Sequence, residues 1–162
     1  MKAILVIFLV AGVCGLVPSE ASKVHSITLQ KSKSEPSTKG EYHTVTAYAD
    51  GTASKEDETY ERNFPKTGDV YKRYSASIDA AKFRSLVENF DRLGFFSKKT
   101  TDKPEGDMNL IVLSEGRGSK YLSLDGAQDQ DTAEMVKEFN DLTKDLDWHP
   151  DQPDGANASK NK

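Results

Sequence analysis

The chain has 162 residues, a formal net charge of −4 at pH 7 and a pI near 5.4. An acidic chain has no electrostatic attraction for nucleic acid or for an anionic membrane surface, so we expect neither partner. The only cysteine is Cys14, which excludes a disulfide scaffold and chemistry that needs paired thiols.

The first 21 residues have the pattern of a secretory signal peptide. Lys2 precedes an apolar run from Ala3 to Val17, and small residues at Ser19 and Ala21 suit cleavage after Ala21. The run is shorter than the roughly 20 residues of a membrane span, so we expect no transmembrane anchor once the signal is removed. The predicted location is secreted or periplasmic. The alternative is a lipoprotein signal, in which Cys14 carries the lipid.

Four strands are predicted before the first helix, on the basis of alternating apolar and polar residues. They span Val24–Gln30, Glu41–Tyr48, Thr52–Phe64 and Val70–Ile78. Lys31–Gly40 contains no aliphatic or aromatic residue and predicts a flexible loop. Asp50 and Gly51 tolerate positive φ and predict a tight hairpin between the second and third strands.

The stretch Asp79–Phe96 predicts an amphipathic helix that organises the domain. Asp79 can cap its first turn, Gly94 can adopt the left-handed conformation past its last turn, and two phenylalanines then return the chain to the core. The helix needs a sheet to cover its apolar stripe. That stripe consists of Phe83, Leu86, Val87, Phe90 and Leu93.

After a polar loop, Met108–Leu113 is the most apolar strand, and we expect it at the centre of the sheet. A hairpin leads to the strand Lys120–Leu124. A second helix is predicted over Thr132–Leu146, with Asp131 as its cap and Glu134 completing a capping box. Residues 150–162 are polar and predict a disordered tail.

These elements predict an α+β fold in two layers. A mostly antiparallel sheet of about five to six strands carries two amphipathic helices on one face. Residues 22–149 form a single domain in this interpretation, between the signal peptide and the tail.

Several short motifs occur along the chain: Ile27 to Leu29, Tyr48, Asp50, Gly51, Thr52, Leu93, Gly94, Phe95, Phe96, Thr101, Asp102 and Pro104. Together they resemble the bacterial secreted family called Domain of Unknown Function 6438. The resemblance covers about Val24 to Trp148 and implies a fold and a secreted location, because that family has no established activity. Members typically carry a cysteine pair after the first strand, where this chain has the cysteine-free stretch Lys31–Gly40.

The sequence shows no catalytic signature, so we expect a protein that is not an enzyme and has no cofactor. No serine lies on a glycine-flanked elbow between a strand and a helix. The histidines His25, His43 and His149 lack a paired ligand spacing and are interpreted as surface residues. His25 and His43 could meet across neighbouring strands, which leaves a small hydrolase that uses either of them as an alternative.

Two further patterns have ordinary explanations. The acidic residues Asp125, Asp129, Asp131 and Glu134 could hold calcium, but their spacing does not match a calcium loop and helix capping accounts for them. We therefore predict no metal site. Asn157 begins a glycosylation acceptor sequence that matters only in a eukaryote.

Tyrosines in the strands are the strongest sign of a function. Tyr42, Tyr48, Tyr71 and Tyr74 could form a surface for an unknown protein partner, and the alternative is ordinary cross-strand packing. We therefore predict a secreted or periplasmic, non-catalytic binding module, such as an inhibitor or accessory protein. A lipid-anchored structural envelope protein is the other alternative, and the oligomeric state stays open.

Overall fold

The computed structural model describes residues 23–34, 39–61, 70–101, 103–115, 118–126 and 128–151. The predicted signal peptide, the lipidation candidate Cys14 and the glycosylation candidate Asn157 lie outside these residues.

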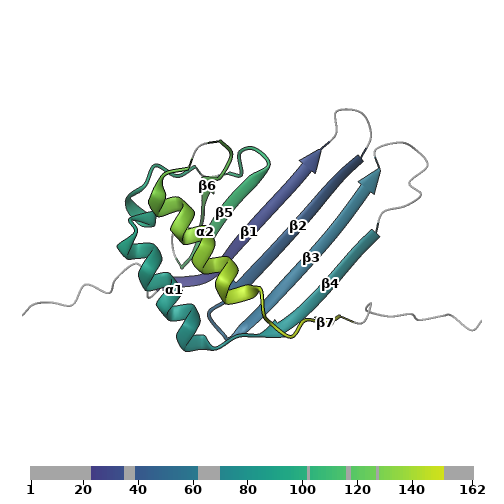
Figure 1. The fold of residues 1–162 in the computed structure, drawn as a ribbon, viewed down its shortest axis with the longest axis horizontal. Coiled ribbons are helices and arrows are strands. Elements are labelled where there is room, and N and C mark those ends of the chain that lie inside the picture. The colour runs from purple at the N-terminus through teal and green to yellow at the C-terminus, as the bar shows by residue number, and fades with distance from the viewer. Residues whose placement is uncertain are drawn as a thin grey trace, which may run out of the picture.

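The strands form one antiparallel sheet in the order β6-β5-β1-β2-β3-β4-β7 (Figure 1). The sheet has seven strands rather than the five to six expected, because two residues after the second helix pair with Tyr74 and Ser75 at one edge. The strands are β1 Val24–Ser34, β2 Lys39–Tyr48, β3 Thr52–Glu61, β4 Val70–Ser77, β5 Met108–Ser114, β6 Gly118–Ser123 and β7 His149–Pro150.

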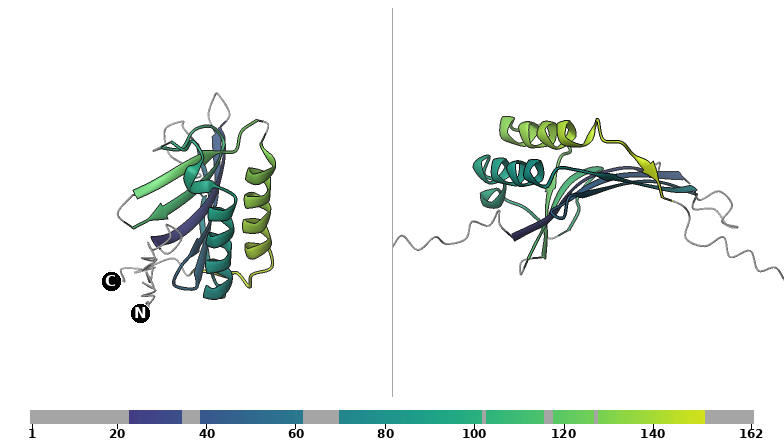
Figure 2. Two further views of the ribbon diagram at one scale, coloured as in Figure 1. Left: turned by 90° about the vertical axis from the view of Figure 1, so that its left-hand side faces the viewer. Right: turned by 90° about the horizontal axis from the view of Figure 1, so that it is seen from below.

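Two helices, α1 Ala80–Arg92 and α2 Gln130–Thr143, lie side by side on one face of the sheet (Figure 2). A short 3-10 turn, η2 Phe95–Ser97, follows α1. The predicted α+β class with its antiparallel sheet is therefore confirmed. We call the sheet surface under the helices the helix face and the opposite surface the open face.

Helix α1 begins and ends as its sequence predicts. The carboxylate of Asp79 accepts a hydrogen bond of 2.7 Å from the amide of Ala81. Gly94 has φ of 77°, a left-handed conformation that residues with a side chain rarely adopt. The chain then turns sharply, and Phe95 enters the core completely buried.

Helix α2 begins two residues earlier than expected, and Asp131 is not its cap. Asp129 takes that position, where its carboxylate accepts a hydrogen bond of 2.7 Å from the amide of Thr132. Lys98 lies 2.9 Å from the same carboxylate and holds it in place. Because Lys98 is far away in the sequence, the local pattern could not distinguish the two aspartates.

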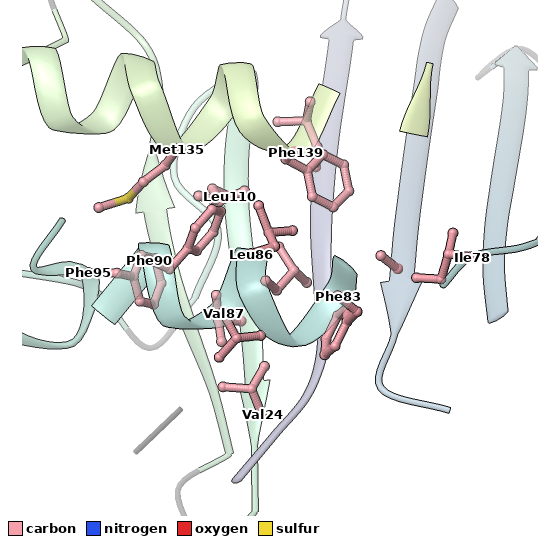
Figure 3. Close-up of a cluster of buried hydrophobic side chains, with 14 of the residues drawn as sticks. Val24, Ile78, Phe83, Leu86, Val87, Phe90, Phe95, Leu110, Met135 and Phe139 are labelled. Atoms are coloured by element: carbon pink, nitrogen blue, oxygen red, sulfur yellow. The ribbon is translucent and has the colours of Figure 1, made fainter. Parts of the chain in front are cut away.

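The core lies between the two helices and the sheet (Figure 3). Helix α1 contributes its predicted apolar stripe, and α2 adds Met135 and Phe139, both completely buried. Below them, Leu110 and Val112 of β5 and Ile27 of β1 are at most 2% exposed. Strand β5 is well buried as expected, but it lies between β6 and β1, one strand in from the edge.

The hairpin of β1 and β2 is longer than predicted. Its pairing continues to Ser34 opposite Gly40, so much of the expected loop Lys31–Gly40 is strand. The far ends of β1 to β4 extend beyond the helices in Figure 1. We call this part the projecting half of the sheet and the part under the helices the covered half. The loop prediction failed because a backbone ladder needs no apolar side chains.

The segment before β5 is fixed by side chains that bind its backbone. Asn109 is completely buried, accepts a hydrogen bond of 3.1 Å from the amide of Glu105 and donates one of 3.4 Å to the carbonyl of Gly106. Asp125 accepts hydrogen bonds from the amides of Asp107 and Met108. A side chain at Gly106 would overlap this carboxylate, so the position requires glycine.

Candidate functional site

The candidate site is the open face of the sheet, which the two helices leave uncovered. The strand register determines which side chains point there, because successive residues alternate between faces. On the open face, directly opposed residues form rows across the sheet, and many of these residues are serine, threonine or tyrosine. The side chains of Thr28 and Thr46, for example, form a hydrogen bond of 2.9 Å.

This face carries almost no charge in a chain of which 30% is charged. On the open-face positions of the described strands, the only charged residues are Glu56, Glu58 and Arg73, all on β3 and β4. The rest of the face is a neutral area built mainly on β6, β5, β1 and β2. Its residues are Ser119, Tyr121, Ser123, Ile111, Leu113, Ser26, Thr28, Gln30, Ser32, Tyr42, Thr44, Thr46 and Tyr48. Asn109 also points to this side, but it is buried under the segment before β5.

All the large hydrophobic side chains that are strongly exposed in the described residues lie on this face. Leu113 is 41% exposed, Tyr48 is 36% exposed and Tyr71 is 53% exposed. In most single-chain domains such side chains are scattered over the surface, and a set gathered on one face marks an interaction site.

Leu113 and Tyr48 act together at one end of the neutral area. Both are directly opposite Ser26, which is only 7% exposed although no helix covers it. The hydroxyl of Tyr48 lies 3.3 Å from that of Ser54, so the ring lies along the sheet. We call Tyr48 and Leu113, with the buried Ser26 between them, the apolar platform.

A polar network marks the other end of the open face. The guanidinium of Arg73 donates hydrogen bonds of 2.9 and 2.6 Å to Glu56 and lies 5.7 Å from the centre of the Tyr71 ring. The pKa of the Tyr71 hydroxyl is raised, first by partial desolvation and then by its hydrogen bond to Glu56. The pKa of Arg73 is also raised, chiefly by its hydrogen bond to Glu56. The network holds Tyr71 in place while half of its surface stays exposed.

The structure brings three of the four predicted tyrosines onto one face. Tyr42, Tyr48 and Tyr71 lie on the open face, with Tyr42 and Tyr71 in the same row. Tyr74 does not join them. It lies on the helix face of the projecting half, where Lys55 is 5.4 Å from its ring centre. Tyr74 is three positions after Tyr71, and residues an odd number of positions apart point to opposite faces of a regular strand.

The histidines give little support to the hydrolase alternative. His43 lies 2.8 Å from Asp57, but its side chain is 54% exposed on the helix face of the projecting half. His25 and His43 do not meet. The backbone of His25 bonds to Ala49, whereas His43 is opposite Lys31, six residues or about 20 Å further along β1.

His149, interpreted from the sequence as an isolated surface residue, has neighbours that the sequence did not reveal. It is opposite Ser75, lies 3.4 Å from Asp147 and shares with them a hollow of about 490 Å³. The side chains of His149 and Asp147 are 71% and 92% exposed. Because a nucleophilic serine needs a hydrogen-bonded base held in fixed geometry, this hollow lacks what acyl transfer requires.

The acidic cluster is divided among structural contacts. Asp125 binds the backbone before β5, whereas Asp129 caps α2 and pairs with Lys98. The pKa of Asp129 is lowered to about 2, first by its hydrogen bond to Lys98 and then by that to the Thr132 amide. Among the described residues, no group of three or more acidic, histidine or cysteine side chains is placed to hold a metal ion.

A second hollow, of about 400 Å³, lies between α1 and α2. Asn89 donates a hydrogen bond of 3.2 Å to Glu138 there, and the other carboxylate oxygen of Glu138 is buried without a partner among the described residues. One water molecule in the hollow would satisfy this oxygen. The hollow therefore gives less reason for a binding site than the open face does.

None of the described helices has the length and apolar content needed to cross a membrane. Comparison with known protein families, with curated proteins and with solved structures found no match to this chain. The resemblance to the Domain of Unknown Function 6438 family therefore stays a prediction.

Proposed function

We propose that the protein is a secreted or periplasmic, non-catalytic binding module that holds a protein partner on the open face of its sheet. The gathering of Tyr48, Tyr71 and Leu113 on this one face carries the proposal. Location and partner class rest on the sequence, through the signal-like amino terminus and the tyrosines.

The composition of the face supports a protein partner. Interfaces between proteins are depleted of charge at their centre and enriched in tyrosine and arginine. Antibody binding surfaces combine tyrosine with serine and asparagine, because tyrosine gives contact area at low entropic cost and the small polar residues adapt their hydrogen bonds. The open face likewise combines tyrosine with small polar residues, here serine and threonine, and its charged residues are confined to β3 and β4.

The size of the face is also suitable. Six strands spaced by about 4.8 Å and four steps of about 6.7 Å along a strand give roughly 24 by 27 Å, or about 650 Å². A stable protein complex buries about 800 Å² of accessible surface on each partner. Since side chains make the accessible area larger than the flat projection, the face can hold one partner of ordinary size.

The test compares the protein with two variants in capture from the extract of its own organism. Tyr48→Ser with Leu113→Ser removes the apolar platform, and Tyr74→Ser removes a tyrosine of similar sequence context from the other face. We expect one protein to be retained by the native chain and by Tyr74→Ser, and at least about tenfold less by the platform variant. Circular dichroism checks that each variant is folded.

The proposal fails if nothing is retained by the native chain, or if the platform variant retains the same protein equally. Loss of capture only with Tyr74→Ser would also contradict it, because that result would assign binding to the helix face.

A further inference from the structure

We infer that the partner places an arginine or lysine side chain against Glu58, between Tyr42 and Tyr71. This inference rests on the proposed function and adds the chemistry of the partner. It concerns one row of the open face, at the opposite end from the platform of Tyr48 and Leu113.

The register builds this row directly. On β3, Glu58 is opposite Tyr42 of β2 on one side and opposite Tyr71 of β4 on the other. Directly opposed side chains in an antiparallel sheet begin about 5 Å apart, so a carboxylate rises between two aromatic residues. Carboxylates and the faces of aromatic rings both attract cations.

Glu58 has no cation of its own among the described residues. It is exposed and makes neither an ion pair nor a hydrogen bond there. The neighbouring Glu56, two residues away on the same face, is satisfied twice over by Arg73. Arg73 neutralises Glu56, so among the described charged residues of the open face the negative charge of Glu58 stays uncompensated.

The contact of Arg73 with Glu56 and Tyr71 shows that this surface already binds one cation within the chain. Arg73 pairs with Glu56 and lies over the ring of Tyr71, so a guanidinium, a carboxylate and a tyrosine combine on this surface. Glu58, opposite Tyr71 on the same surface, repeats the carboxylate beside a tyrosine, but no described cation pairs with this carboxylate. Arginine fits best, because its planar group can pair with the carboxylate and stack on a ring at once.

A second copy of the chain is a poor source of this cation. In a face-to-face pair, the open face of the copy supplies Arg73 as its only described basic residue, and Arg73 is bound to Glu56. The partner is therefore a different protein, which presents a basic side chain beside an uncharged contact area.

The test titrates the full chain with two short peptides and follows backbone amide signals by NMR. One is acetyl-Gly-Arg-Gly-amide, and the other replaces arginine by citrulline, which has the same shape without the charge. We expect the arginine peptide to bind at least about fivefold more tightly, with the largest shifts at Tyr42, Glu58 and Tyr71. The difference should shrink in 0.5 M salt, because exposed charges are screened.

Matched variants make the assignment specific. Glu58→Gln should lower arginine binding to the citrulline level, whereas Glu88→Gln, an exposed acid on α1, should leave it unchanged. Tyr71→Leu keeps the carboxylate and should give an intermediate affinity. Equal binding of the two peptides, shifts centred elsewhere or an unchanged Glu58→Gln variant would each overturn the inference.

The two proposals fail separately. The platform variant could lose its captured protein while Glu58→Gln keeps full capture and the two peptides bind equally. That result would support a partner on the open face and contradict a basic side chain against Glu58. If sedimentation shows a dimer that only the platform variant abolishes, the occupant is a second copy and the inference is wrong.

Discussion

The covered and projecting halves of the helix face belong to the same strands yet differ completely in character. Under the helices, one row holds Ile27, Ala47, Ala53 and Ala76, all at most 7% exposed. Four residues further along each strand, the row on the same face is Lys31, His43, Asp57 and Lys72.

This contrast shows that strand pairing and burial are independent. The backbone ladder continues unchanged through both rows, although only one of them has a second layer above it. Small alanines lie under the helices in the covered half. In the projecting half, polar side chains contact one another instead: His43 lies 2.8 Å from Asp57 across two strands, and Lys55 lies 3.6 Å from Asp57 along β3. Four predictions follow the contrast, from the largest effect to the smallest.

A carboxylate introduced into the covered row should unfold the protein, because this row is buried under the helices. Ala47→Glu places an unpaired charge in the core, and we expect a loss of more than about 4 kcal/mol or no folded protein at all. His43→Ala, on the same strand and face in the projecting half, should change the free energy of unfolding by less than about 1 kcal/mol. Urea denaturation followed by circular dichroism measures both. Similar losses would show that the projecting half is covered in solution.

Removing a covering side chain tests the upper layer itself. Phe139 is completely buried on α2, so Phe139→Ala should reduce the free energy of unfolding by about 3–5 kcal/mol. Tyr74→Ala, which loses a contact with Lys55 in the projecting half, should cost only about 1 kcal/mol. If the two costs were alike in denaturant unfolding, the second layer would not account for the stability of the covered half.

Amide hydrogen exchange should be slower in the covered half of a strand than in the projecting half of the same strand. We expect the amides of Ile27 and Leu29 to exchange at least about tenfold more slowly than those of Lys31 and Lys33, because local opening is easiest where few apolar contacts hold a strand. Mass spectrometry or NMR can follow the exchange at neutral pH. Uniform protection along β1 would mean that the strands open only as a whole.

The ion pair that fixes the start of α2 should give a small, pH-dependent effect. The folded pKa of Asp129 is about 2, below its ordinary value of 3.8, so its stabilisation is present above about pH 4 and is lost as the pH falls towards 2. Asp129→Asn keeps a capping side chain but loses the charge. We expect a lower Tm than the native chain at pH 7 and a smaller difference at pH 3.

Asp131→Asn is the control for this prediction, since Asp131 is 3.9 Å from Lys98 and is not the cap. A difference between the native chain and Asp129→Asn that stayed constant from pH 7 to pH 3 would contradict the assigned cause.

Much of the fold follows from local patterns. The apolar stripe and both ends of α1 were predicted correctly, because the cap and the left-handed glycine act within one turn. The alternation of β2 also placed Tyr42 and Tyr48 together on one face. These features depend on neighbours along the chain, which a sequence displays directly.

The remaining features depend on residues that are far apart in sequence. Lys98 selects Asp129 as the cap of α2, and the pairing with β4 creates β7 from two residues without a strand pattern. The row of Tyr42, Glu58 and Tyr71 could not be predicted, because Glu58 stands in an acidic stretch, Glu56 to Glu58, that gives no sign of its neighbours on other strands. Parity within each strand could have excluded Tyr74, but only the register could align Glu58 with its two neighbours.

The short strand β7 has a consequence for how these molecules behave in concentrated solution. The amide of Asp151 bonds to the carbonyl of Arg73, so the amide position of Pro150 points away from the sheet. Proline has no hydrogen to offer there, and an incoming strand finds no donor at this position. At this position the edge therefore cannot donate a hydrogen bond to a strand of a second molecule, which disfavours edge-to-edge pairing there.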